Sequence, residues 1–198
     1  MLTAKGKITT KTIIDELVAT GFVKQESAEK ALMQSRGGEF LKLHPLVQIA
    51  TYQLELANQP GKHLTSQLLA EWLADQVAMP YYHIDPLKID AASITKVMSY
   101  EFAKRQGVLP LEVNEDEVIV ATCEPFITGW ESTVEQVTQK RVKKVIAPAD
   151  DIQKYSLEFF TLAKSISGAH RSGSSHGKLG NLEQLLELGN LKSPDAND

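Results

Sequence analysis

Apolar residues recur at every third or fourth position through the first part of the chain, which is the spacing of an amphipathic helix. Ile13, Ile14 and Leu17 begin the first such run, and Gly21 follows as a helix stop. We expect residues 1–77 to form an all-helical subdomain, with Leu32 on the buried side of its second helix. The pattern predicts four helices: 13–18, 25–34, 45–57 and 65–77.

Strand-like runs begin to alternate with helical runs near Tyr81. Only Asn114–Glu117 separates two of the predicted strands, so these two should pair as an antiparallel hairpin. The order is β-α-β-β-α-β-α, that of a ferredoxin-like unit or a close variant, over residues 78–167. The predicted fold class is therefore α+β. The predicted strands are 82–84, 108–113, 118–122 and 142–146, and the helices are 94–106, 127–138 and a last one from Pro148.

The composition changes again after residue 167. Residues 168–180 are rich in Gly, Ser, His and Arg, which is typical of a flexible linker. A leucine-rich amphipathic piece, Asn181–Leu188, and a polar tail follow. We interpret residues 181–198 as the start of a further domain or as a tail.

Length, charge and cysteine content exclude several classes of protein. The chain has 198 residues, and its net charge of -4 argues against nucleic-acid binding through bulk electrostatics. A single cysteine, Cys123, excludes an internal disulfide and a cysteine-rich zinc site. No apolar run reaches the ~18 residues that span a membrane. We expect a cytoplasmic protein that is not inserted directly in a membrane and reaches one only through a partner.

The candidate chemical motifs have simpler structural interpretations. Gly173–Lys178 resembles a phosphate-binding loop, but the spacing of its glycines is one residue short and Leu179 stands at the magnesium-ligand position. The five histidines lack metal-ligand spacing, so we predict no metal site and no catalytic residue. Cys123 should be buried and inert, and Glu124 a helix cap. The basic cluster Lys140–Lys144 is interpreted as protection of a sheet edge, with a docking patch for an acidic surface as the alternative.

A series of short motifs, in fixed order, resembles one protein family. Together they resemble the amino-terminal domain of the type II secretion and type IV pilus assembly ATPases, over roughly residues 10–167. The motifs are Leu73–Tyr82, which ends a helix in Gln-Val-Ala-Met-Pro-Tyr, then Ile84–Asp90, Ala103–Leu111, Val118–Pro125 and Val145–Pro148.

This resemblance implies a non-catalytic domain that precedes a hexameric motor ATPase. The sites for ATP and magnesium would belong to that missing motor, residues 168–180 to the joint, and residues 181–198 to the start of the motor or to a tail. The expected partner is the cytoplasmic domain of an inner-membrane platform protein, which would hold the motor at the inner membrane. We expect the helical half to dock, through outer faces that carry Glu16, Lys24, Glu26 and Lys30.

Some members of the family bind cyclic di-GMP through two tandem helical motifs, and this is the alternative function. The candidate residues here are Gln34, Leu69, Leu73 and Gln76. However, Thr12 stands where the motif has arginine, and Ile14 where it has glycine. A guanine-phosphate ligand needs the arginine to pair and the glycine for close backbone approach. Docking is therefore the preferred function.

Overall fold

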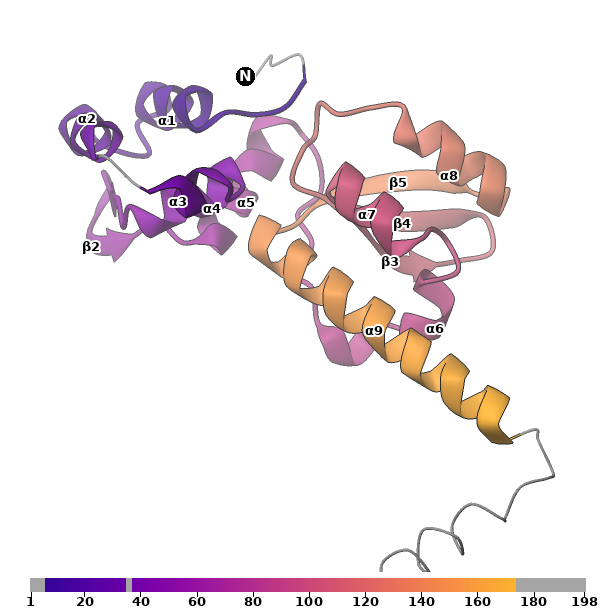
Figure 1. Ribbon diagram of the computed structural model, residues 1–198. Helices are drawn as coiled ribbons and strands as arrows, with labels where there is room; N and C mark the ends of the chain where they lie inside the picture. The colour runs from indigo at the N-terminus through magenta and orange to yellow at the C-terminus, as the bar shows by residue number, and fades with distance from the viewer. Residues whose placement is uncertain (1–5, 35–36, 174–198) are drawn as a thin grey trace, which may run out of the picture. The chain divides into compact units, whose positions relative to one another are not determined.

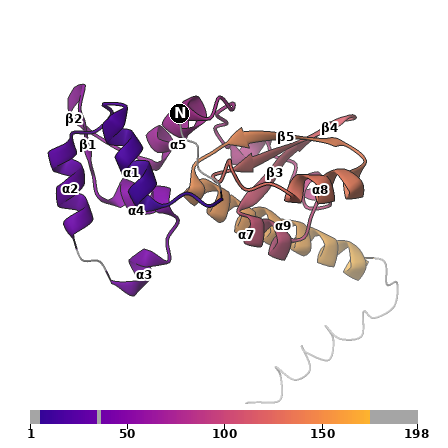
Figure 2. The ribbon, with the colours of Figure 1, turned by 90° about the horizontal axis from the view of Figure 1, so that it is seen from above.

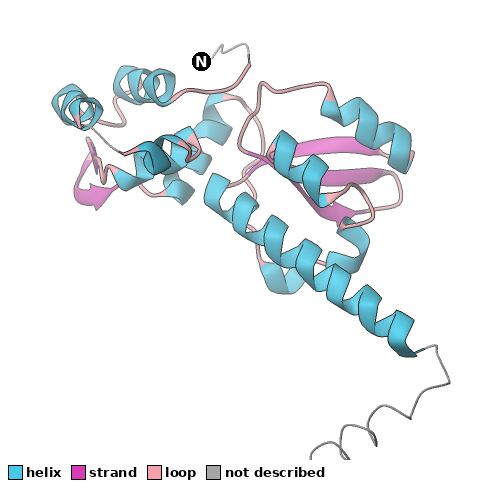
Figure 3. Cartoon of the chain, viewed as in Figure 1, coloured by secondary structure: helices cyan, strands magenta, loops and turns pink. Residues whose placement is uncertain are grey.

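The computed structural model of the chain describes residues 6–34 and 37–173 (Figure 1). Residues 1–161 form one compact unit, and residues 162–198 are grouped as a second. Helices and strands are mixed along the chain, which confirms the α+β class (Figure 3). Within the described part of the chain, none of the helices combines the length and apolarity needed to cross a bilayer.

The amino-terminal elements pack around a core of leucine and isoleucine side chains. Ile13, Leu17, Ile49 and Leu69 are completely buried there. Side-chain caps fix the starts of two of the helices, because Thr9 accepts from Thr12 N–H and Thr65 accepts from Leu68 N–H. The elements are α1 (Thr10–Ala19), α2 (Gln25–Met33), α3 (Gly38–Leu41), α4 (Pro45–Thr51), β1 (Glu55–Leu56), β2 (Gln59–His63) and α5 (Ser66–Gln76), seen from above in Figure 2.

The prediction that residues 1–77 are all helical is wrong, because β1 and β2 form an antiparallel hairpin. The third predicted helix ends at Thr51 rather than near residue 57. Gln53 takes a left-handed conformation, with φ 54, which stops the helix. Leu54 and Leu56 are then buried on either side of exposed Glu55. This two-residue alternation is typical of a strand, but it is too short to stand out in the sequence.

The second half of the first unit is built on a three-stranded sheet. Strands β3 (Val108–Val113) and β4 (Glu117–Thr122) form the predicted antiparallel hairpin. Strand β5 (Arg141–Ile146) pairs in parallel with β4 through the crossover helix α8 (Trp130–Thr138). The strand order is β3-β4-β5, so β3 and β5 are the outer strands. The register in which β3 pairs with β4 shifts between Pro110 and Glu112 of β3.

The sheet is a variant of the ferredoxin-like arrangement, because its strand order differs. In that arrangement the first strand splits the last βαβ unit, whereas here β4 pairs directly with β5. The predicted strand 82–84 is reduced to a parallel bridge between Tyr81 and Ile146, on the far side of β5 from β4. Pro80 and Pro86 bracket this segment, and Pro86 starts a 3₁₀ turn (η1, Pro86–Lys88), so no longer extended run can form.

The predicted helix 94–106 is two helices. α6 (Ala91–Ile94) is capped by the Asp90 side chain, and α7 (Tyr100–Gln106) is capped by the Ser99 hydroxyl. The Ser99 hydroxyl accepts a hydrogen bond from the backbone N–H of Phe102, so a new helix can start at Tyr100. This cap explains the break. Gly107 ends α7 in the left-handed conformation, as its position in the sequence predicts.

The last described helix, α9 (Ala149–Gly173), is longer than predicted. The linker was expected to begin at residue 168, but residues 168–173 are helical. A single glycine inside a helix costs only ~1 kcal/mol relative to alanine, which does not end a helix by itself. Residues 174–180, most of the predicted linker, and residues 181–198 lie outside the described residues.

Candidate functional site

Exposed apolar side chains occur at the end of α2 and in and just after α3. Leu32 and Met33 are 43% and 83% exposed at the end of α2, and Leu41 and Leu43 are 68% and 39% exposed at and after α3. On α9, Leu157, Leu162 and Ile166 are also exposed, at 55%, 51% and 41%. Grouped exposed apolar residues commonly mark interaction sites, and methionine adapts to irregular partners. We call residues 32–34 and 37–43 the α2–α3 surface.

The position of Leu32 corrects the prediction that it faces the core. Ala28 and Ala31 supply the buried positions of α2, each 3% exposed, and Leu32 lies beside this narrow buried face. Leu41 and Leu43 were not singled out from the sequence. A usable signal existed there, because both lie in a short segment between Gly38 and Pro45 that has no helical period of its own.

Charged side chains beside this surface are paired with one another. Lys30 and Glu26 form an ion pair of 2.6 Å on α2, and Lys42 and Glu39 form one of 2.5 Å on α3. The hydrogen bond and charge of Lys30 hold the pKa of the Glu26 carboxyl below its usual value. The charges of both signs balance, so the apolar side chains distinguish this surface more than its charge does.

The candidate cyclic di-GMP residues occupy different environments. Leu69 and Leu73 lie one turn apart on α5 and are completely buried. Gln76, at the end of α5, is half-buried, and Gln34, at the end of α2, is exposed. Ile14, at the glycine position of the motif, is buried with 1% exposure and fills the space that a close ligand contact would need. A ligand role for these four residues stays a prediction.

A buried carboxylate joins the amino-terminal segment to the end of β4. Glu124 is 6% exposed, and its Oε2 accepts from the Ile8 backbone N–H at 2.9 Å. Its Oε1 lies 3.1 Å from Nε2 of His44, the cap residue of α4. Because His44 Nδ1 accepts from the Leu46 N–H at 3.3 Å, Nε2 carries the proton and donates to Glu124. The sequence interpretation of Glu124 as a simple helix cap missed this connection.

Two residues of the basic cluster Lys140–Lys144 make polar contacts within the α/β part. Lys140 Nζ donates to the carbonyl oxygens of Asn114 and Glu115, both at 2.6 Å, and so closes the β3–β4 turn. Lys144 pairs with Glu131 at 2.8 Å. Arg141 and Lys143 are exposed on the outer strand β5, where charges discourage pairing with another sheet.

Cys123 is buried, as the sequence predicts, with 4% exposure. Burial, with a smaller effect from the Glu124 charge, raises the pKa of its thiol to about 12. A thiol with so high a pKa is protonated at neutral pH and is a poor nucleophile. In residues 6–34 and 37–173, no cluster of His, Cys, Asp and Glu has the arrangement of a metal site.

Comparison with known proteins identifies the class of domain. The sequence profile of the MshEN domain matches residues 77–165. The chain is 32% identical over 200 residues to the type IV pilus assembly ATPase TfpB of Acinetobacter baylyi, a match that takes in 100% of this chain and 34% of that protein. The chain thus spans about a third of the length of this curated relative.

Two solved structures are also similar. MshE, solved with cdg, is 20% identical with a TM-score of 0.48, and the match covers 74% of this chain and 97% of that chain. The N-terminal domain of XpsE is 12% identical with a TM-score of 0.47, covering 76% of this chain and 95% of that chain.

Residues 77–165 of this α+β chain therefore match the MshEN domain, and the whole chain is similar to part of a type IV pilus assembly ATPase. The family resemblance carried by the motifs from Leu73 to Pro148 is confirmed.

Proposed function

We propose that this chain is a non-catalytic docking domain, which anchors a secretion or pilus-assembly motor to the cytoplasmic domain of an inner-membrane platform protein. The observation that supports this most is the α2–α3 surface, where Met33 and Leu41 are 83% and 68% exposed. Leaving such side chains in water is unfavourable, and their burial by a partner would supply binding energy at about 25 cal/mol per Å². The motor would bind ATP and magnesium, form the hexamer and lie at the inner membrane only through this contact.

A deletion of the helical half is a poor test of docking. One apolar cluster runs from Ile8 to Phe159 and includes Leu69 and Leu73 of α5 together with Val145 and Ile146 of β5. Removing residues 1–77 would expose this shared core, so a loss of binding could come from unfolding. Surface substitutions avoid this problem.

The decisive variant is Met33→Asp with Leu41→Asp. Full-length motor carrying both changes should move from the membrane fraction to the soluble fraction. The 1–198 chain should lose at least tenfold in affinity for the purified platform domain, measured by calorimetry. Leu87→Asp is the matched control, because Leu87 is 94% exposed on η1, away in sequence from this surface. Unchanged recruitment of the double variant would refute docking through the α2–α3 surface.

The basic patch offers the competing docking face. Arg141→Glu with Lys143→Glu tests it without disturbing Lys140 and Lys144, which have structural hydrogen bonds or ion pairs. This pair of changes should reduce affinity by less than the double aspartate variant does. If only the charge reversal releases the motor, the sheet edge is the docking face.

The alternative, a cyclic di-GMP sensor, receives less support. It would need Gln34, Leu69, Leu73 and Gln76 to meet a ligand, yet Leu69 and Leu73 are 0% exposed. No cofactor is required for docking.

A further inference from the structure

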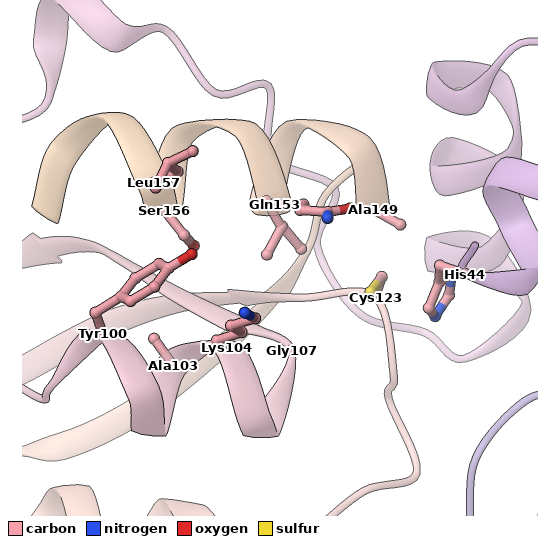
Figure 4. A pocket seen from close by; sticks show the side chains of 11 residues that line it. His44, Tyr100, Ala103, Lys104, Gly107, Cys123, Ala149, Gln153, Ser156 and Leu157 are labelled. Atoms are coloured by element: carbon pink, nitrogen blue, oxygen red, sulfur yellow. The ribbon is translucent and has the colours of Figure 1, made fainter. Parts of the chain in front are cut away.

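A cavity lies between α7 and α9, and His44 of the amino-terminal part also lines it. Its volume is ≈ 360 Å³, within the range of ~300–1,000 Å³ that is usual for small-molecule sites. Helices α7 and α9 form its two long walls, and Cys123 at the end of β4 lies at one end, close to His44 (Figure 4). The docking function proposed above makes no use of this space.

The lining is mostly apolar. Ala103 of α7 and Ile152 and Leu157 of α9 contribute aliphatic surface, and the Tyr100 ring contributes aromatic surface. The Cys123 thiol is protonated because burial raises its pKa, so this end of the cavity carries no charge on the sulfur. Such a lining favours a ligand with an apolar body.

One buried hydroxyl lines the cavity. Ser156 is 5% exposed, and its side chain points from α9 toward Tyr100 of α7 (Figure 4). A hydroxyl in the lining of a cavity can donate a hydrogen bond to a ligand, so Ser156 can supply a polar contact within an otherwise mostly apolar space.

The charges of the lining favour an anion. Lys104 is the lining residue with a full positive charge, and its Nζ lies 5.9 Å from the centre of the Tyr100 ring. No Asp or Glu is among the described lining residues. The charges of Glu124 and Asp150 act on the Cys123 thiol at the opposite end, where they raise its pKa. The Lys104 end is therefore the place for a negative group.

We propose that the cavity between α7 and α9 binds a small carboxylic acid with an apolar body. The apolar body lies between Tyr100, Ile152 and Leu157, while the carboxylate faces Lys104 and accepts from the Ser156 hydroxyl. His44 lines the same cavity and holds Glu124, which in turn holds Ile8. A bound acid would therefore add contacts close to the hydrogen bonds of Glu124 that hold the amino-terminal segment at Ile8.

The test uses 1-naphthoate as a probe and the 1–198 chain, followed by amide NMR shifts. Saturable shifts confined to residues 103–107, 123 and 152–157 are expected. A ligand of this size at ordinary efficiency should have a Kd on the order of 1 mM or tighter. No shifts up to 5 mM (roughly five times that Kd), or shifts centred on other residues, would overturn the proposal.

Two variants and an uncharged probe separate the parts of the proposal. Lys104→Gln should weaken the affinity for 1-naphthoate by about fivefold, which is the size of an exposed charge interaction. The affinity for 1-naphthalenemethanol should not change. Lys143→Gln makes the same charge change on β5 and should affect neither probe. Ser156→Ala, which is compatible with a helix, should also weaken the acid. Equal effects of Lys104→Gln and Lys143→Gln on 1-naphthoate would show that no cation in the cavity selects the acid, and would reject this ligand class.

Discussion

His44 Nε2 donates to Glu124 Oε1 at 3.1 Å and so connects residues that are 80 positions apart in the sequence. The other oxygen of the same carboxylate accepts the backbone N–H of Ile8, which is 116 positions away. One buried side chain thus holds three segments: the approach to α1, the start of α4 and the end of β4.

Loss of this carboxylate should destabilise the chain. Glu124→Ala would leave the buried Ile8 N–H and the His44 Nε2–H without acceptors, and we expect a loss of about 2–4 kcal/mol in the free energy of unfolding. Glu124→Gln keeps an acceptor oxygen and should cost less. Urea denaturation measures both, with the exposed Glu158→Ala as control, expected within about 0.5 kcal/mol of the original. A Glu124→Ala loss no larger than that of the control would show that the carboxylate does not hold these segments.

Cys123 should report on unfolding and on alkaline pH. The pKa of its thiol is raised from 9.0 to about 12 by burial, so the folded state holds this proton more tightly than the unfolded state. The resulting stability is complete below pH 9.0 and is lost as the pH rises toward about 12. Cys123→Ala should therefore reduce the fall in stability between pH 9 and pH 11. Identical pH slopes for the two proteins would contradict the burial of the thiol.

The same thiol should react slowly in the folded chain. With a disulfide reagent at pH 8, labelling should accelerate by at least tenfold when urea opens the structure, because the folded thiol is both buried and protonated. Stopped-flow absorbance checks this. Labelling at the rate of a free thiol, without urea, would mean that β4 opens readily at this end.

Gly107 should be required for its backbone conformation alone. Its φ is +66, and a Cβ there would meet no atom within 4 Å, so Gly107→Ala should cost about 1 kcal/mol through strain at the end of α7. Gly38 has no positive φ and equally open space, so Gly38→Ala is the control and should be neutral or slightly stabilising. Thermal unfolding distinguishes them. Equal effects would argue against a conformational role for Gly107.

Cyclic di-GMP should bind weakly or not at all. The arginine position of the motif holds Thr12, whose hydroxyl is hydrogen-bonded to that of Thr9 at 2.7 Å, and the glycine position holds buried Ile14. Titration calorimetry of the 1–198 chain should give no saturable heat at micromolar ligand. Micromolar affinity that is lost in Gln76→Ala, with Gln53→Ala unaffected, would favour the sensor function.

Local rules in the sequence predicted the parts of the fold that depend on neighbouring residues. The β3–β4 hairpin follows from the short run Asn114–Glu117 between two strand-like runs. The place of Tyr81 beside β5 depends on pairing with Ile146, which no local pattern encodes.

The site was less predictable for the same reason. The link between His44 and Glu124 joins distant segments, and the exposure of Leu32 depends on which face of α2 packs against the rest of the chain. The cavity between α7 and α9 likewise exists only once both helices are placed. The family motifs were informative in a different way, because their order follows from a fold in which such distant contacts form.

The outer strands of the small sheet also limit how copies of the chain can associate. Pro110 has no N–H to offer, and the register shift beside it makes the outer strand β3 irregular. On β5, the backbone of Pro80 and Tyr82 already bonds to Ile146, and Arg141 and Lys143 charge the remainder. The sheet is thus closed to strand addition at both sides, so crowding many copies together should not lead to sheet-mediated aggregation.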